Sequence, residues 1–236
     1  MRFSAIFKPT SLFSLKSSNA TNSGAKSLFL PSPYAIKMAI LNQAITVGGE
    51  LEKLSSKKSQ EFGYIRDTKI TYFLPENSCF CVNNSFIKIL KQKDDKRSKK
   101  QREEGVLFEP GFIQTVAFRE YIHISEDIEI IFDVESKEAE EFLKKYLFRI
   151  NYFGKKGCFF QFVRYEENPS ISNVSEFDSE EFKPGIIEEY DDFDSKSNFE
   201  NVDNFSSKTT KREKLILTLP LEIIGSSKSF SCYKVI

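Results

Sequence analysis

The stretch SLFLPSPYAIKMAIL, residues 27–41, decides how the N-terminal part of the chain folds. Pro31 closes an apolar extended segment. Ser32 followed by Pro33 predicts a helix start, because a serine hydroxyl accepts backbone N–H groups and proline suits the first helical position. The side chains predicted to share one face of that helix are Tyr34, Met38, Leu41 and Ile45. Gly48-Gly49 ends the pattern, so the stretch predicts a rigid strand-to-helix junction and one helix.

The sequence before this stretch predicts a strand and then a polar loop. RFSAIFK, residues 2–8, has the pattern of a half-buried strand. A loop rich in Ser, Asn and Gly follows as far as Ser27. Residues 1–49 contain no acidic residue, and their basic residues are Arg2, Lys8, Lys16, Lys26 and Lys37. Such one-sided charge favours a polyanionic partner at this end of the chain.

Charge is segregated even though the 34 basic and 34 acidic residues of the chain cancel. From Glu166 to Asp203 only Lys183 and Lys196 oppose a long acidic run of low complexity. This composition predicts a mobile, solvated insertion over about residues 166–210. Its interspersed Phe and Tyr residues leave open the alternative that it docks locally.

Several function classes find no support in the sequence. The four cysteines, Cys79, Cys81, Cys158 and Cys232, lack the paired C-x-x-C spacing of a zinc site, and a single histidine excludes a multi-histidine metal site. Nucleotide-binding loops, the hydrolase nucleophile elbow and the zinc-protease motif are absent. We therefore expect reduced cysteines, no catalytic residue, no metal and no cofactor.

No apolar run approaches the ~18 residues of a membrane span, so we expect no membrane partner and a cytoplasmic protein. The basic, Ser-rich N-terminus overlaps with organelle transit peptides. Pro9 and the strand-like RFSAIF argue against a presequence helix.

The remaining pattern predicts an α+β fold. SKEAEEFLKKYLFRI, residues 136–150, is the clearest helix, with Ser136 as its cap. Further strands are predicted at 69–75, 79–93, 106–125, 128–135, 157–165, 214–224 and 230–236, and a more polar helix within 50–65. This order is compatible with a ferredoxin-like core. The long excursion between the two main helices predicts an antiparallel arm at about 79–124, and the last two strands predict a C-terminal hairpin.

Three features carry candidate binding residues. The arm tip, residues 91–102, opposes seven basic side chains with only Asp94 and Asp95; the basic residues are Lys91, Lys93, Lys96, Arg97, Lys99, Lys100 and Arg102. Such density favours a phosphate backbone, although a solvated hairpin tip explains it as well. In FREYIHIS, alternation places Arg119, Tyr121 and His123 on one face, suited to phosphate contact and base stacking. The turn before the last strand offers Lys228, although a plain hairpin turn needs no ligand.

These motifs, in this order, resemble a known family. The first strand, the polar loop and the L-P-S-P-Y-A-I-K-M-A-I-L junction resemble the first strand and helix of the CRISPR-associated "Cas five" subunits of the RAMP superfamily. The arm that ends in F-R-E-Y-I-H-I is similar to their thumb hairpin, and the terminal G-S-S-K-S-F-S-C-Y-K-V fits their closing hairpin. The three anchors span residues 1–135 and 214–236.

The resemblance implies a single RAMP-type, RRM-like domain over residues 1–236, with a long thumb. It also implies a non-enzymatic subunit of a type I CRISPR effector (Cascade-like) complex. Such a subunit caps the 5′ handle of the crRNA, contacts the backbone and large subunits, and meets target DNA only indirectly. By position, the implied RNA contacts are Lys16, Lys26, Lys37, Lys91, Lys93, Lys96, Arg97, Lys99, Lys100, Arg102, Arg119, Tyr121 and Lys228.

Two alternatives stay open. Some family members cleave precursor crRNA with a Tyr/His/Lys cluster, and His123 is a possible acid or base for a metal-independent endoribonuclease. No convincing family cleavage motif accompanies it. The other alternative is a protein-interaction subunit without RNA contact. We further expect the Lys-bearing loop before Pro31 to order only with guide RNA, with a phosphate at the adjacent helix N-terminus.

Overall fold

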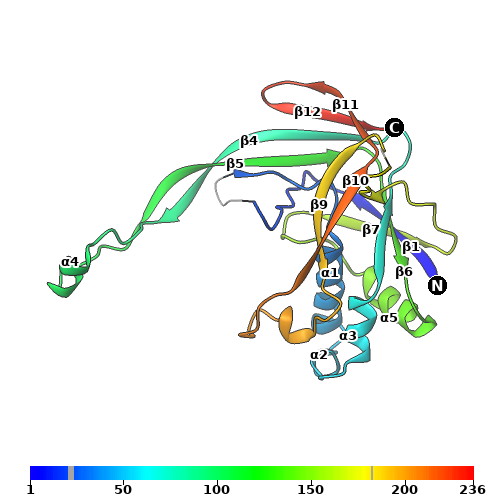
Figure 1. The fold of residues 1–236 in the computed structure, drawn as a ribbon, viewed down its shortest axis with the longest axis horizontal. Helices are drawn as coiled ribbons and strands as arrows, with labels where there is room; N and C mark the ends of the chain where they lie inside the picture. Colours follow the sequence, from blue (N-terminus) through cyan, green and yellow to red (C-terminus); the bar gives the residue numbers. More distant parts are fainter. Residues whose placement is uncertain (21–23, 182) are drawn as a thin grey trace.

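The computed structural model describes residues 1–20, 24–181 and 183–236. Its body contains a four-stranded antiparallel sheet of order β3-β6-β1-β7 (Figure 1). The strands are β1 (Arg2–Pro9), β3 (Lys69–Phe73), β6 (Ile128–Asp133) and β7 (Phe160–Glu166). Helix α1 (Pro33–Thr46) lies between β1 and β3 in the chain, and α5 (Lys137–Leu147) lies between β6 and β7. The mixed α/β architecture with antiparallel sheets that the sequence predicts is confirmed.

The predicted junction forms as the residue types dictate. The hydroxyl of Ser32 accepts a 3.1 Å hydrogen bond from the backbone N–H of Ala35, and Pro33 is the first residue of α1. The four side chains predicted to share one face of α1 pack on the core, Leu41 fully buried and Tyr34, Met38 and Ile45 partly buried. Apart from Leu41, the prediction did not include the most buried positions of the helix, which are Pro33, Ile36, Lys37, Ile40, Leu41 and Ala44. The reason is that a second layer also covers α1, so buried residues lie on more than one side of the helix.

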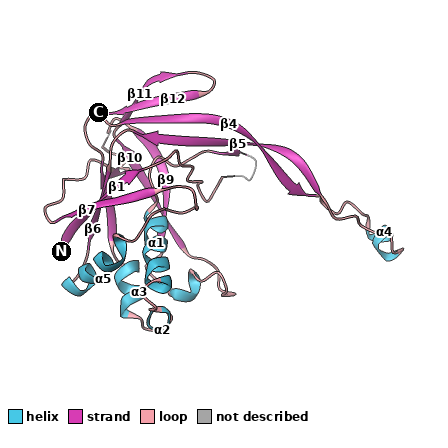
Figure 2. Cartoon of the chain, turned by 180° about the vertical axis from the view of Figure 1, so that it is seen from behind, coloured by secondary structure: helices cyan, strands magenta, loops and turns pink. Residues whose placement is uncertain are grey.

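The other helices gather beside α1 in one layer (Figure 2). Helix α5 begins after Ser136, whose hydroxyl accepts from the N–H of Ala139 at 3.2 Å, as predicted. The single polar helix expected within 50–65 is two short helices, α2 (Leu51–Leu54) and α3 (Gln60–Arg66). The break arises because Ser59 caps a new helix, accepting from the N–H of Phe62 at 2.9 Å.

A long hairpin projects from the body and forms the arm (Figure 1). Strands β4 (Cys79–Gln92) and β5 (Phe112–Ile124) pair continuously from Phe80↔Ile124 to Gln92↔Phe112. The return strand begins at Phe112, later than the predicted 106. The tip contains helix α4 (Lys99–Glu103), which Ser98 and Gln101 start with a capping box. The sequence analysis predicted no helix at this charged tip, because the capping box was not recognised.

The base of the arm belongs to a second sheet, of order β11-β12-β4-β5-β2. Strand β2 (Gly24–Ala25) is a short edge strand, and β11 (Leu221–Ser226) and β12 (Phe230–Val235) form the predicted C-terminal hairpin. The strand expected over 214–224 is split, because Pro220 separates β10 (Arg212–Leu219) from β11. No helix of the described residues is long and apolar enough to cross a membrane.

The acidic segment supplies the second layer over α1. Strands β8 (Ser175–Glu176), β9 (Ile186–Phe193) and β10 form a sheet of order β8-β10-β9, and a 3-10 turn, η1, spans Phe199–Asn201. Tyr190 and Phe193 are buried, and the Phe193 ring lies 5.0 Å from that of Tyr34. The expectation of a solvated insertion is therefore corrected for these residues. For these residues the structure has local docking, the alternative left open, because the rings of Phe193 and Phe199 pack against Phe62 of α3.

Candidate functional site

The arm tip contains two kinds of cation. Four of the seven predicted residues are paired with acidic residues of the tip itself: Lys91 with Asp94 (2.9 Å), Arg97 with Asp95 (2.8 Å), Arg102 with Asp95 (3.4 Å) and Lys100 with Glu104 (3.8 Å). The hydrogen bonds from Arg97 hold the pKa of Asp95 well below its usual range. Lys93, Lys96 and Lys99 have no ion-pair partner within the described residues. These three are the tip cations most available to an external anion.

The face of β5 predicted from alternation is confirmed. Ile122 and Ile124 are buried, while His123 is exposed. By register, Arg119 lies opposite Ser85, Tyr121 opposite Asn83 and His123 opposite Cys81. The opposite face holds Glu120, whose carboxylate accepts from the N–H of Ser27 at 2.9 Å. Arg119 and Tyr121 thus share one face along the inner part of the arm.

A small cavity lies where the helix start was expected to face a lysine-bearing loop. It has a volume of about 250 Å³, and its lining includes Lys16, Tyr34, Lys155, Asp191 and Arg212. The Arg212 guanidinium stacks over the Tyr34 ring at 4.2 Å and pairs with Asp191 at 2.7 Å. Lys16 and Lys155 are exposed at its rim.

Sequence reasoning missed Lys155 and Arg212, because they come from segments distant in the chain. The glycine-flanked pair in GKKG, residues 154–157, was a usable signal for an exposed basic turn. Nothing local in the sequence around Arg212 indicates its stacking on Tyr34.

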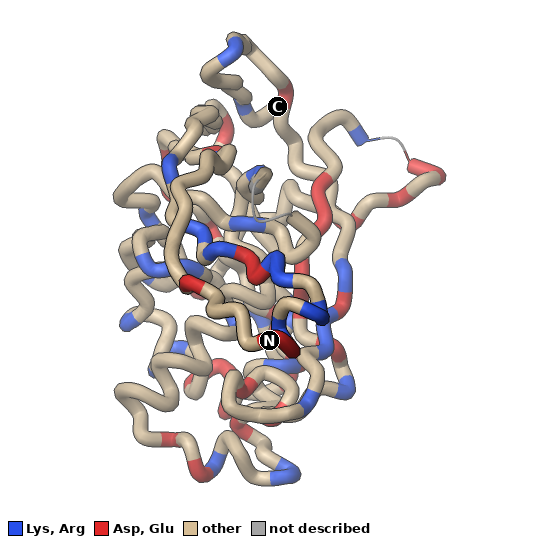
Figure 3. Tube along the Cα trace, turned by 90° about the vertical axis from the view of Figure 1, so that its left-hand side faces the viewer, with Lys and Arg blue, Asp and Glu red and all other residues tan. Residues whose placement is uncertain are grey.

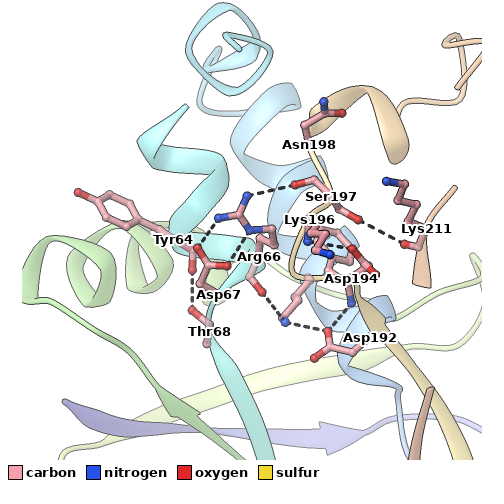
Figure 4. Close-up of polar contacts among 12 residues, drawn as sticks. Tyr64, Arg66, Asp67, Thr68, Asp192, Asp194, Lys196, Ser197, Asn198 and Lys211 are labelled. Carbon is pink, nitrogen blue, oxygen red and sulfur yellow. Dashed lines mark hydrogen bonds and ion pairs between the residues drawn. The ribbon is translucent and has the colours of Figure 1, made fainter. Parts of the chain in front are cut away.

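Lys37 is not available for RNA in this structure, which corrects its place among the candidates. Its side chain is 2% exposed; the ammonium lies 2.7 Å from a carboxylate oxygen of Asp192 and donates to the carbonyl of Arg66 at 2.8 Å. Burial lowers the pKa of Lys37 and raises that of Asp192. Figure 4 shows the surrounding contacts, in which Arg66 binds Asp67 and the carbonyl of Ser197. Acidic β9 therefore neutralises this helix cation from within the chain.

The other candidates lie apart from the arm tip. Lys26 and Lys228 are exposed, the former beside β2 and the latter in the β11–β12 turn. An isolated β-bridge pairs Lys16 with Ser27, the residue after Lys26. The backbone positions of Lys16 and Lys26, the two predicted lysines of the N-terminal loop, therefore lie close together. Residues 21–23 of that loop lie outside the described residues. Viewed from the side of the arm, basic and acidic positions lie interspersed in space over most of the described residues, although the two kinds are segregated along the sequence (Figure 3).

The opening stretch is held by buried polar groups. The hydroxyl of Tyr72 donates to the carbonyl of Pro31 at 2.6 Å, and the N–H of Phe29 donates to Glu188 at 3.1 Å. The hydroxyl of Tyr190 donates to the same carboxyl oxygen of Glu188. Burial is the main cause that raises the pKa of Glu188 to about 7. The junction is thus fixed from both β3 and β9.

This geometry defines a class of protein: an α/β body with antiparallel sheets, from which a basic hairpin arm projects. No protein-family model matches the chain. The curated CRISPR-associated protein Cas5 of Archaeoglobus fulgidus is 25% identical over 207 residues, which cover 84% of this chain and 82% of that protein. The resemblance to the Cas five family that the three sequence anchors predict is therefore confirmed.

Two solved structures are also similar. A crystal structure of a CRISPR protein from Archaeoglobus fulgidus aligns with a TM-score of 0.43 and 12% identity, over 100% of this chain and 92% of that chain. A chain of the Type III-B Cmr-beta complex bound to cognate target RNA and AMPPnP aligns with a TM-score of 0.36 and 12% identity, over 98% of this chain and 86% of that one.

Proposed function

We propose that this chain is an RNA-binding subunit of a CRISPR effector complex. More specifically, we propose the non-catalytic subunit of a type I, Cascade-like complex that binds and caps the 5′ handle of crRNA. The similarity to a Cas5 protein supports the class. The observation that carries the proposal is the arm itself, a paired β4–β5 hairpin whose tip holds three cations without ion-pair partners in the described part of the chain.

The positions of the basic and aromatic side chains suggest that different parts of the molecule bind different parts of the RNA. Lys93, Lys96 and Lys99 at the tip would neutralise phosphates of the guide strand, because release of condensed counterions favours such contacts. Arg119 and Tyr121, further in, suit a phosphate and a stacked base. The cavity beside α1, with Lys16 and Lys155 at its rim, would take a second part of the handle. Lys26 and Lys228 remain candidates at exposed positions.

We read the body as a ferredoxin-like, RRM-like core within one RAMP-type domain. The chain order β1-α1-β3-β6-α5-β7 and the sheet order β3-β6-β1-β7 support this reading, because they match the β-α-β-β-α-β arrangement of that fold. The arm would reach a neighbouring backbone subunit, the body would meet the large subunit, and target DNA would be reached only through the assembly. We place this assembly in the cytoplasm.

One experiment tests the proposal directly. The chain is co-expressed with a repeat-containing transcript and candidate backbone and large subunits, and the RNA that copurifies is sequenced. We expect RNAs that share one defined 5′ handle. Assembly with the partner subunits but without RNA would instead support the protein-interaction alternative. RNA of random sequence and ends would remove the handle-capping role.

The endoribonuclease alternative has weaker support. An acid–base histidine is normally oriented by a second group. Within the described residues His123 has no hydrogen-bond partner, and its register neighbour on β4 is Cys81. We therefore propose that the chain holds RNA without cutting it.

A further inference from the structure

Two cysteines face each other where the arm meets the C-terminal hairpin. Cys81 on β4 and Cys232 on β12 are direct partners in the strand register. Their sulfur atoms lie 3.2 Å apart, and both side chains are half-buried free thiols. This pair joins strands separated by most of the chain.

The backbone hydrogen bonds show which kind of pair this is. The backbone N–H of Asn84 donates to the carbonyl of Ser229, and the N–H of Val235 donates to the carbonyl of Ser78. The even-numbered residues of β4 therefore direct their backbone N–H and C=O groups to β12. The N–H of Ser125 donates to Cys79, so odd-numbered residues direct theirs to β5. Cys81 and Cys232 are therefore a non-hydrogen-bonded pair. Such pairs bring Cα atoms to about 4.5 Å, within the span of about 4.4–6.8 Å that disulfides bridge.

The other two cysteines are placed differently. Cys79 lies opposite Lys234 in the register. It shares β4 with Cys81, so the two cannot bond across the sheet. Cys158 is buried, and its thiol donates to the carbonyl of Ser14 at 3.5 Å. The geometry thus singles out one pair among the four thiols.

We propose that Cys81 and Cys232 are a redox modification site that forms a reversible disulfide with an organic disulfide as oxidant. One protein thiolate attacks the oxidant, forming a mixed disulfide and releasing one small thiol. The second protein thiolate attacks the protein sulfur of that mixed disulfide, which closes the Cys81–Cys232 bond and releases the second small thiol. Two protein thiols are oxidised, one organic disulfide is reduced to two thiols, and the two protons pass to the leaving thiolates.

The bond would have a defined mechanical effect. It would fasten β12, and with it the Lys228 turn, to the base of the arm. Because the cross-link closes a very long loop, it restricts the unfolded chain and raises the midpoint of urea unfolding. The hydrogen bond with Cys232 raises the pKa of the Cys81 thiol, so the reaction should accelerate at alkaline pH, where the thiolate forms.

The test uses the full chain and glutathione disulfide. We expect the intact mass to fall by two hydrogen atoms. A non-reducing tryptic digest should link peptide 70–88 to peptide 229–234, and dithiothreitol should reverse the link. Because peptide 70–88 contains both Cys79 and Cys81, the digest is repeated on Cys79→Ser, which should retain the link. Cys81→Ser and Cys232→Ser should each lose it.

The same digest of the unaltered chain keeps the proposal falsifiable if a serine variant misfolds. In the unaltered chain, a glutathione adduct that persists on peptide 70–88 or 229–234, or unchanged thiols at alkaline pH, would overturn the proposal. Fragment-ion sequencing of the linked peptides distinguishes Cys79 from Cys81 in the same digest, and a link through Cys79 would overturn it as well.

Discussion

The backbone N–H of Phe29 donates a 3.1 Å hydrogen bond to a carboxyl oxygen of Glu188. This bond ties the stretch that starts α1 to the acidic strand β9, far along the chain. Tyr190 donates to the same oxygen, and the carboxyl is largely removed from water. Two opposing effects therefore meet at Glu188: hydrogen bonds that favour its charged form, and burial that disfavours it.

Burial wins, which predicts a pH dependence of stability. The pKa of Glu188 is about 7 in the folded chain, against an ordinary value of 4.5. Between these values the folded state keeps a proton that the unfolded state has lost, so stability falls as pH rises toward 7 and is level above it. Glu188→Gln stays neutral and retains an oxygen for both donors. We expect it to exceed the parent in stability at pH 8 by up to about 3 kcal/mol, and by little at pH 5.

Urea unfolding at the two pH values measures this effect. Glu213→Gln, on the exposed face of neighbouring β10, is the matched control for loss of one carboxylate and should not show the same pH difference. An equal pH dependence in the parent and in Glu188→Gln would contradict the assignment.

The buried pair of Lys37 and Asp192 predicts a non-additive pair of variants. Lys37→Met leaves Asp192 buried without its cation, which should cost about 3 kcal/mol of unfolding free energy. Adding Asp192→Asn removes the orphaned charge, so the double variant should be more stable than Lys37→Met alone. Urea unfolding of the two single variants and the double variant closes the cycle. If the losses of unfolding free energy in the two single variants add up to the loss in the double variant, Lys37 and Asp192 do not interact.

Local rules recovered the helix starts and failed at long-range burial. Ser32 and Ser136 cap α1 and α5 as predicted, because a cap depends on residues within one turn. Lys37 was misjudged for the opposite reason. Its neutralising partner, Asp192, is 155 residues away in sequence, and no local pattern reports it. The same holds for Arg212 beside Tyr34 in the cavity.

The acidic segment was misjudged because composition outweighed pattern. Its charge suggested a solvated chain, yet Tyr190 and Phe193 of β9 are buried, and the Phe193 ring stacks on Phe62 of α3. Carboxylates of β9 also form ion pairs with basic side chains: Asp191 pairs with Lys214 at 2.6 Å and with Arg212. The near-zero net charge of the chain is consistent with such internal ion pairs. It was the clearest feature of the sequence that indicated them.

The unpaired tip cations predict a specific salt effect. Replacing Lys93, Lys96 and Lys99 together by serine should weaken guide-RNA binding. It should also lower the slope of log affinity against log salt by about 2, since each single-strand phosphate contact contributes about 0.7. Binding is measured by titration at several salt concentrations. The matched control replaces Lys57, Lys58 and Lys137, exposed on the helical side, and should leave the slope nearly unchanged. Equal losses in both variants would indicate only a general charge effect.

The cavity beside α1 predicts a difference between two adjacent lysines. Lys155 lines the cavity, whereas Lys156, also exposed, is not among its lining residues. Lys155→Ser should reduce guide-RNA affinity by about fivefold, the loss of roughly one charge-assisted contact, while Lys156→Ser should have a smaller effect. The urea midpoint of both variants should match the parent, because both side chains are exposed. A larger loss for Lys156→Ser would place the RNA outside this cavity.

The exposed His123 predicts an absence of cleavage. Metal-independent ribonuclease chemistry needs a proton donor and acceptor held beside the scissile phosphate, and no group of the described residues orients this imidazole. Labelled repeat RNA incubated with the chain in EDTA should therefore remain intact on a denaturing gel, for the parent and for His123→Ala alike. His123→Ala should also retain guide-RNA binding to within about twofold, because Tyr121 and Arg119 on the same strand face are unchanged. Cleavage at one position by the parent, lost in His123→Ala, would reverse the assignment and make the chain an endoribonuclease.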